Sequence, residues 1–447
     1  MTVGMVVAVV AAGATTRTRR GPAVTQSRAA DPLLADAMAL ALGATPEQLA
    51  AVAAEMAGTG DVGWVPYLVD MTRIFRVEGS VRRFGAALES LTGVLVPDDP
   101  RDVYTTYGTW MYDHDVVPVA GYRRWKATMY GIVGPEFVPL LESVDDPRLA
   151  AELQWGGVRR GGIAELNAPP VIPVSAAGYM IDTELTFGAT VAGESRAYPH
   201  RILDRHELAN DVLGGEPVAL VDCTLCRTGV LYSRRVGGQV LDFETSGLLL
   251  NSNKIMVDRQ TDSLWVQLTG EAIAGPLQGV VLDRFPLTVT RWGAWRAEHP
   301  DSSVVAIPTG IPSDYPPGAP YRNYFEAPEL WFPAASVPDV FAAKERMGTV
   351  ELDGAFLAVS VSALAQAGPQ VLGVGGASVL AVPTPAGIRF YGDARPGDAE
   401  VLVESSDGAA VLSDGTARPR VLDGQSFWFA WYAAHPDTAW WPQAGQG

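Results

Sequence analysis

Cysteine is nearly absent from this chain: its 447 residues include two, Cys223 and Cys226. Two cysteines exclude the disulfide framework that stabilises small secreted domains. A bridge between residues this close in sequence closes a very short loop, so it adds little stability through chain entropy. We therefore treat the pair as a candidate for chemistry, either as two metal ligands or as a redox-active dithiol, and regard a purely structural bridge as the weakest interpretation.

Positive charge is also scarce. Lys and Arg number 33 against 50 Asp and Glu, and the formal net charge is −17. A surface that binds nucleic acid needs Lys and Arg gathered in excess to neutralise phosphates. The composition therefore predicts no nucleic-acid partner and leaves a small-molecule substrate open. Apolar residues make up 48% of the chain, which is enough for large cores in two or three domains.

Long apolar runs are missing except at the N-terminus, and no stretch predicts a transmembrane helix. The run over residues 3–14 has the length of a signal peptide and is too short to span a bilayer. Its basic cluster, at residues 17–20, follows the run instead of preceding it as a signal peptide requires. We predict a signal or unstructured segment over residues 1–30 and an exported or periplasmic protein, with a cytoplasmic location as the alternative.

Residues 31–150 carry the period of amphipathic helices, with apolar residues returning every three or four positions. Thr45, with Gln48 three positions later, predicts a capped helix start. Beyond about residue 155 the chain turns to Gly, Pro and short β-type runs, and "VLYSRRVGGQVLDF" predicts a hairpin around Gly237 and Gly238. The predicted fold class is α+β, with a helical region followed by mainly-β chain.

An internal repeat divides the β-rich part. "WGAWRAEHPDS" from Trp292 and "WFAWYAAHPDT" from Trp428 share the pattern W-x-x-W-x-x-x-H-P-D-[ST]. This spacing places both Trp and the His on one side of a short helix that Pro ends, so we expect it to close each module by burying the Trp pair. We predict two related mainly-β modules with short helices: residues 151–345 with the cysteines, and residues 346–447 as a degenerate copy without them. Residues 312–333, rich in Pro and aromatics, predict an ordered crossing segment.

The cysteine pair stands between two β-type runs, "PVALVD" and "GVLYSRR". A tight strand–turn–strand aims two thiolates at one metal ion, whereas the helix that follows a thioredoxin-like C-x-x-C is missing from the pattern. A zinc ribbon needs a second such pair, so other ligands are required. His206 and Met256 are the candidates, and two thiolates, an imidazole and a thioether favour Cu(I), with zinc second. The simpler interpretations are a buried, hydrogen-bonded His206 and core packing for Met256.

Three long segments, residues 197–234, 246–277 and 290–302, resemble the domain-of-unknown-function family DUF3179. The motifs that carry the resemblance are Y-P, H-E, N-D, C-x-L-C, S-N-x-x-M, D-R, L-W-x-Q and T-G-E. The likeness covers about residues 150–340 and extends more loosely into the C-terminal module. It implies that the motif residues matter and that the protein is a bacterial one of a kind often exported, and it implies no established activity.

Those motifs hold more polar residues than packing requires, and we predict that they orient metal ligands or a substrate. The set is Glu207, Asn210, Asp211, Asn253, Lys254, Asp258, Arg259, Gln267 and Glu271. Turn caps and surface ion pairs account for part of it. The leading hypothesis is a copper-dependent oxidoreductase with three protein ligands and an open position for oxygen or substrate. The alternatives are a non-catalytic metal-binding or scaffold protein and a thiol–disulfide redox protein.

Overall fold

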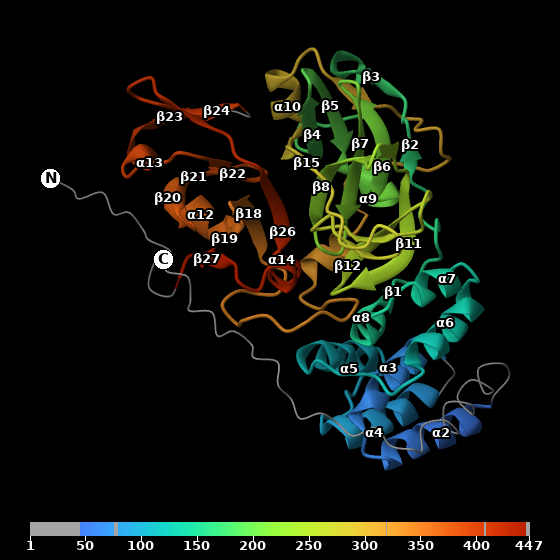
Figure 1. Ribbon diagram of the computed structural model, residues 1–447. Coiled ribbons are helices and arrows are strands. Elements are labelled where there is room, and N and C mark those ends of the chain that lie inside the picture. Colours follow the sequence, from blue (N-terminus) through green and yellow to red (C-terminus); the bar gives the residue numbers. More distant parts are fainter. Residues whose placement is uncertain (1–44, 76–78, 319, 406–407, 444–447) are drawn as a thin grey trace.

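The computed structural model describes residues 45–75, 79–318, 320–405 and 408–443 (Figure 1). The predicted signal segment, residues 1–30, lies outside the described residues. Helices come first and a mostly-β body with short helices follows, which confirms the α+β fold class. In the described part of the chain, no helix has the length and apolar character needed to cross a membrane.

The helical region forms one layer at the base of the molecule in Figure 1. Thr45 caps its first helix as predicted, because its hydroxyl accepts from the Gln48 N–H and its own N–H donates to the Gln48 side chain at 2.8 Å. The helices are α2 (Pro46–Gly58), η1 (Val62–Trp64), α3 (Val65–Ile74), α4 (Ser80–Thr92), α5 (Asp102–Asp113), α6 (Tyr122–Val133), α7 (Phe137–Glu142) and α8 (Pro147–Glu152).

Three five-stranded sheets make up the first β-rich part. Their orders are β16-β4-β5-β17-β3, β15-β8-β7-β6-β2 and β1-β11-β12-β13-β14. The strands are β1 (Gln154–Trp155), β2 (Leu166–Asn167), β3 (Val171–Pro173), β4 (Leu185–Val191), β5 (Glu194–Pro199), β6 (Leu208–Leu213), β7 (Glu216–Cys223), β8 (Thr228–Ser233), β11 (Phe243–Leu250), β12 (Asn253–Asp258), β13 (Leu264–Val266), β14 (Ala272–Ala274), β15 (Arg284–Phe285), β16 (Thr288–Arg291) and β17 (Ser303–Val305).

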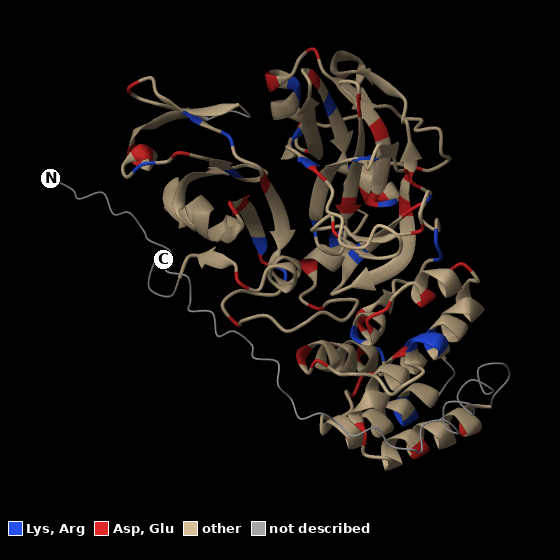
Figure 2. Ribbon diagram, in the orientation of Figure 1, with Lys and Arg blue, Asp and Glu red and all other residues tan. Residues whose placement is uncertain are grey.

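Short elements complete this part of the chain. The helices η2 (Val174–Ala176), α9 (His200–His206) and α10 (Trp292–Glu298) follow β3, β5 and β16. The strands β9 (Arg235–Val236) and β10 (Gln239–Val240) pair in the hairpin predicted at Gly237 and Gly238. Basic and acidic side chains are dispersed over the molecule (Figure 2).

The sheet that contains β7 is the middle layer and is buried on both faces. Because side chains alternate along a strand, neighbouring residues of β7 enter different cores. Leu220 packs with Phe187 of β4 on one face. Val221 packs with Met256 and Trp265 of the third sheet on the other. The last residues of β7 therefore lie in the protein interior, although a turn follows them.

The other face of the third sheet rests on the helical region. Leu248, Ile255 and Val257 share one core with helix residues such as Tyr130 and Phe137. The helical layer thus supports the sheet that in turn supports the cysteine-bearing sheet, and these layers follow one another in Figure 1.

The second module repeats the strand arrangement of the first. In the first module, β16 and β5 flank β4 as antiparallel neighbours, and β17 joins β5 in parallel. In the second module, β26 and β19 flank β18 as antiparallel neighbours, and β27 joins β19 in parallel. The elements are β18 (Arg346–Leu352), β19 (Ala355–Ser360), α12 (Val361–Ala367), β20 (Gln370–Val374), β21 (Ala377–Thr384), β22 (Gly387–Tyr391), α13 (Asp398–Val401), β23 (Leu402–Ser405), β24 (Ala409–Leu412), β25 (Ala417–Pro419), β26 (Asp423–Phe427), α14 (Trp428–Ala434) and β27 (Ala439–Trp441).

The repeated tryptophan motif occupies matching places. Helix α10 lies between β16 and β17, and α14 lies between β26 and β27. The indole of Trp295 donates to the Ser302 hydroxyl at 3.1 Å, and that of Trp431 donates to the Thr438 hydroxyl at 2.9 Å. The strands β20, β21 and β22 follow α12 as β6, β7 and β8 follow α9, and the turn at residues 385–386 stands where the first module has its cysteines.

Replacing Trp431 by Ala should lower the free energy of unfolding by about 3–5 kcal/mol, because the side chain is 3% exposed and its removal leaves a cavity. Urea denaturation of the purified protein measures the change. Trp331→Ala is the control, since that indole is 51% exposed and should cost far less. Equal losses in the two variants would contradict a core role for the motif.

His435 should make the fold sensitive to acid. Burial, with the nearby Arg284 charge, lowers the pKa of His435 to about 4. An unfolded histidine titrates near pH 6.5, so below that pH the unfolded state binds the additional proton. The stability that neutral His435 contributes is complete above pH 6.5 and is lost as the pH falls toward 4. The urea midpoint should decrease less between pH 7 and pH 4.5 in His435→Gln than in the natural protein. A His435 ring that titrates near pH 6.5 by NMR excludes this account.

Candidate functional site

The two cysteines lie at the turn between β7 and β8. Cys223 ends β7 and pairs with Thr228, and the Cys226 N–H donates to the Cys223 carbonyl at 3.1 Å across the turn. Arg227 has a φ of 51°, in the left-handed region, which lets the chain enter β8. The predicted strand–turn–strand is therefore present, and its turn brings the two residues close enough to bridge.

The sulfur atoms of Cys223 and Cys226 lie 2.8 Å apart, and both residues are buried, at 2% and 0% exposure. A disulfide has a sulfur–sulfur distance of about 2.05 Å. Two thiolates on one tetrahedral metal ion, each about 2.3 Å from it, lie about 3.8 Å apart. The observed separation lies between these two values.

Polar groups from the third sheet surround the sulfurs. The Asn253 amide donates to Cys226 Sγ at 3.2 Å and to Gln267 Oε1 at 2.9 Å. Gln267 in turn donates to the carbonyls of Val221 and Thr228 at 3.0 Å, which flank the cysteine turn. The Ser252 carbonyl lies 3.4 Å from Cys226 Sγ. This network orients the Asn253 N–H toward the sulfur.

Burial raises the pKa of the Cys226 thiol well above its ordinary value, and the Cys223 sulfur beside it raises that pKa further, while the Asn253 N–H opposes the shift. Charge on Cys226 Sγ is therefore disfavoured in this buried environment. The neutral forms of the pair, dithiol and disulfide, are the forms that this environment stabilises.

A buried ion pair ties the cysteine turn to the third sheet. The Lys254 ammonium donates to Glu207 Oε2 at 2.7 Å, and the Thr224 hydroxyl, between the cysteines, donates to Glu207 Oε1 at 3.1 Å. The Tyr321 hydroxyl also donates to that oxygen, at 3.4 Å. The side chains of Lys254 and Glu207 are 4% and 11% exposed. Both charges are thus satisfied inside the protein.

The structure gives the other two predicted ligands different partners. Both ring nitrogens of His206 lie 2.6 Å from an oxygen, Nδ1 from the Ala164 carbonyl and Nε2 from the Tyr315 hydroxyl. Met256 is fully buried in the core with Trp265. Within the described ranges, no group of three or more His, Cys, Asp or Glu side chains is arranged to hold a metal ion.

Of the nine predicted polar residues, Glu207, Lys254, Asn253 and Gln267 are the ones in this network. The others make their contacts elsewhere. Partners are Phe243 and Asn167 for Asn210, Arg196 and Tyr198 for Asp211, Trp265 and Thr261 for Asp258, Glu165 and Glu244 for Arg259, and the Thr269 hydroxyl for the backbone of Glu271.

A second polar cluster, which sequence reasoning missed, lies on the opposite face of β7. Asp204 from α9 and Asp222 from β7 are 4% and 3% exposed. His200 stacks on Phe187 at 4.0 Å and has Nδ1 3.8 Å from Asp204. In the described structure, Oδ2 of each aspartate and Nε2 of His200 have no hydrogen-bond partner. Arg227 stands over the cluster, its nearby charge opposing the pKa rise of both aspartates.

Electrostatics favour uncharged forms in this cluster. Burial raises the pKa of Asp204 to about 7 and raises that of Asp222 well above its ordinary value. The two carboxyl groups lie within reach of each other, so one shared proton gives both a partner. Burial and the charge of Arg227 lower the pKa of His200. The sequence offered a signal for this cluster, because His200 and Asp204 are four residues apart and Asp222 directly follows the apolar run of β7.

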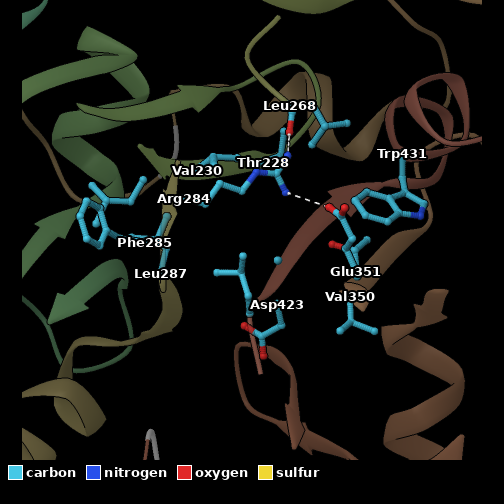
Figure 3. Close-up of a pocket in the computed structure, with 15 residues that line it drawn as sticks. Thr228, Val230, Leu268, Arg284, Phe285, Leu287, Val350, Glu351, Asp423 and Trp431 are labelled. Atoms are coloured by element: carbon cyan, nitrogen blue, oxygen red, sulfur yellow. Dashed lines mark hydrogen bonds and ion pairs between the residues drawn. The ribbon is translucent and has the colours of Figure 1, made fainter. Parts of the chain in front are cut away.

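A cleft runs between the first β-rich part and the second module (Figure 3). Arg284 and Glu351 face each other across it, 3.8 Å apart, and Trp431 lies beside them. Thr228, next to the cysteine turn, also lines this cleft. The charged groups in it already have partners, Arg284 with Glu351 and Asp423 with Arg420, so the cleft by itself identifies no ligand.

Comparison with known proteins yields one match. The sequence pattern of a family described as "Protein of unknown function (DUF3179)" matches residues 160–438, which is more than half of the chain and spans both β-rich modules. No curated protein and no solved structure was found to match the chain.

Lys254→Met should lower the free energy of unfolding by about 3–5 kcal/mol, because it leaves the Glu207 carboxylate buried without its cation. The double variant with Glu207→Gln should recover part of that loss, since no charge then remains unpaired. Urea denaturation of the two single variants and the double variant measures the coupling. Strictly additive losses would show that the two side chains act independently.

Proposed function

The chain belongs to the DUF3179 family of proteins of unknown function, and we propose that it is a thiol–disulfide redox protein that works through Cys223 and Cys226. The observation that carries this proposal is the 2.8 Å separation of the two sulfurs. The C-x-x-C turn supports it, because a turn of this kind needs only a small shift to form the bond.

The proposed reaction is an exchange with a disulfide-bearing reactant, either a small molecule or a protein. One cysteine loses its proton and attacks, so that a mixed disulfide forms and the first thiol of the reactant leaves. The second cysteine then attacks the first one's sulfur, and the second thiol leaves. The cysteine pair loses two electrons and two protons, and the reactant gains them. Because both cysteines lie in one turn, the chain needs no further cysteine for the second step.

The surroundings of the pair support these steps. The Asn253 N–H points at Cys226 Sγ and stabilises negative charge there when the thiolate forms. Gln267 fixes the Asn253 amide, so this donor is in place before the proton leaves. Burial favours the neutral disulfide over the thiolate once the exchange is complete.

Metal binding is the second candidate, in the form of the copper-dependent oxidoreductase predicted from the sequence or of a copper or zinc protein without catalysis. The convergence of both sulfurs and the Ser252 carbonyl on one region favours it. The two thiols must lose their protons and the sulfurs must separate to about 3.8 Å for a tetrahedral site. His206 or Met256 must leave its present contacts to join them.

Export is part of the same proposal. The apolar run at residues 3–14 supports it, and it lies outside the described residues. Oxidising compartments preserve disulfides, whereas the cytosol keeps most thiols reduced. In an exported protein the Cys223–Cys226 pair would meet oxidised reactants.

The proposal is tested on folded protein purified without added metal. Oxidised glutathione should convert the two free thiols into one internal disulfide, seen as loss of alkylation and of two hydrogen atoms in mass, and dithiothreitol should reverse it. Cys226→Ser is the control, because it retains one thiol and cannot form the bond.

Metal analysis of the same preparation separates the two candidates. Less than about a tenth of an equivalent of copper or zinc, together with reversible oxidation, supports the redox proposal. One equivalent of metal that protects both thiols from alkylation overturns the redox proposal. A cysteine pair that stays reduced during one day in oxidised glutathione also overturns it.

A further inference from the structure

A segment between the two modules covers the cysteine pair. We call residues 321–343 the strap; it contains one short helix, α11 (Arg322–Glu326), and the described part of the segment has no strand. Tyr324 and Ala334 of the strap share a core with both cysteines and with Phe427 of the second module. The pair is therefore buried under the strap, and a reactant of any size has no open path to it.

The strap touches each side of the cysteine turn. The Tyr324 hydroxyl donates to the Leu225 carbonyl, between the cysteines, at 3.0 Å. Tyr321 reaches Glu207, as described above, and the Phe325 ring lies 4.2 Å from the Arg227 guanidinium. Phe325 thus contacts the side chain whose charge acts on Asp204 and Asp222.

Lys344, the residue that directly follows the strap, holds the strap in a closed loop. Its ammonium donates to the carbonyls of Tyr324, Ala327 and Glu329 at 2.6, 2.9 and 2.6 Å. It also stands 3.4 Å from the centre of the Tyr324 ring. A single side chain thus satisfies three backbone acceptors of the strap, and these bonds involve a charged donor, which makes them stronger than neutral ones.

The strap has further attachments, none of which is a sheet hydrogen bond. The Phe429 N–H of α14 donates to the Ala343 carbonyl at 2.9 Å, and the Asp113 carboxylate of α5 accepts from the Ser336 N–H and hydroxyl at 2.8 and 2.6 Å. The Ser252 hydroxyl donates to the Phe332 carbonyl at 2.8 Å, and the Asn251 side chain accepts from the Ala335 N–H at 2.8 Å. Detaching the strap therefore breaks no pairing between strands. Segments held in this way open at lower free energy than the core of a protein.

We propose that the strap is a lid over the Cys223–Cys226 pair, that Lys344 is its latch, and that opening admits a disulfide-bearing reactant to the sulfurs. This inference rests on the proposed redox function for its reactant.

The lid is tested by the rate at which reduced, folded protein reacts with a chromogenic aromatic disulfide. When closing is fast, this rate is proportional to the fraction of open molecules. Lys344→Met keeps the apolar stem and removes all three donors, so the rate should rise by about tenfold or more. Tyr324→Phe keeps the ring and removes the bond to Leu225, and it should raise the rate by about threefold to tenfold.

Two controls accompany these variants. Tyr179→Phe also removes a tyrosine hydroxyl bond to a backbone carbonyl, that of Val305, in another part of the first module; its rate should match the natural protein. The reaction of the natural protein should also depend on urea far less steeply than global unfolding does, because opening the strap exposes much less surface than unfolding the whole chain.

The outcomes separate the lid from the redox proposal. Unchanged rates in both strap variants, or a natural rate that follows global unfolding, overturn the lid. If Lys344→Met does not fold, Tyr324→Phe and the urea dependence decide the question. If the strap variants label faster at two separate thiols and form no internal disulfide, the lid stands and the redox function is overturned. If every variant is oxidised reversibly and at the same rate, the redox function stands and the lid is overturned.

Discussion

The burial of the β15-β8-β7-β6-β2 sheet on both faces is the constraint on which the site depends. One core lies between it and the outer sheet, and another lies between it and the sheet that rests on the helices. Strand β7 carries this burial to its last residue, so whatever polar groups stand at its end must find partners inside the protein. Cys223 and Asp222 are neighbours on β7 and point to opposite faces of it, Cys223 into the core that it shares with the strap, which places a sulfur pair and a carboxyl pair back to back across one strand.

A low-dielectric interior explains the character of both groups. Burial raises the pKa of Cys226 and of Asp222, so each favours an uncharged form. Charges that do occur next to the turn are compensated, as in the pair of Lys254 and Glu207. A buried pair of thiols changes most readily by becoming another neutral species, a disulfide, and this is the physical basis of the proposed function. The strap then decides when the change can occur.

The repeated strand arrangement supplies the contrast that marks the site. The two modules share the order of their strands. A helix follows β5 in the first module and β19 in the second, and each module has its tryptophan helix near its end. The second module has Pro385 and Ala386 where the first has its cysteine turn, so the same strand arrangement forms there without cysteines. The cysteines are therefore not a requirement of the fold. The second module still contributes to the site, because Phe427 packs on the cysteine pair and its N–H donates to the Cys226 carbonyl at 2.8 Å.

Local pattern and spacing determined much by themselves: the α+β class, the Thr45 cap, the strand–turn–strand around the cysteines and the repeated tryptophan helix. These features depend on neighbours within a few residues, which a sequence displays directly. Tertiary structure alone decided which distant groups reach the sulfurs. It places Asn253 and Gln267 beside the sulfurs. His206 instead contacts Ala164 and Tyr315, and Met256 packs in a hydrophobic core. Tertiary structure also joined His200, Asp204 and Asp222, because the packing of a helix on a strand depends on the whole layer arrangement, which no short stretch of sequence contains.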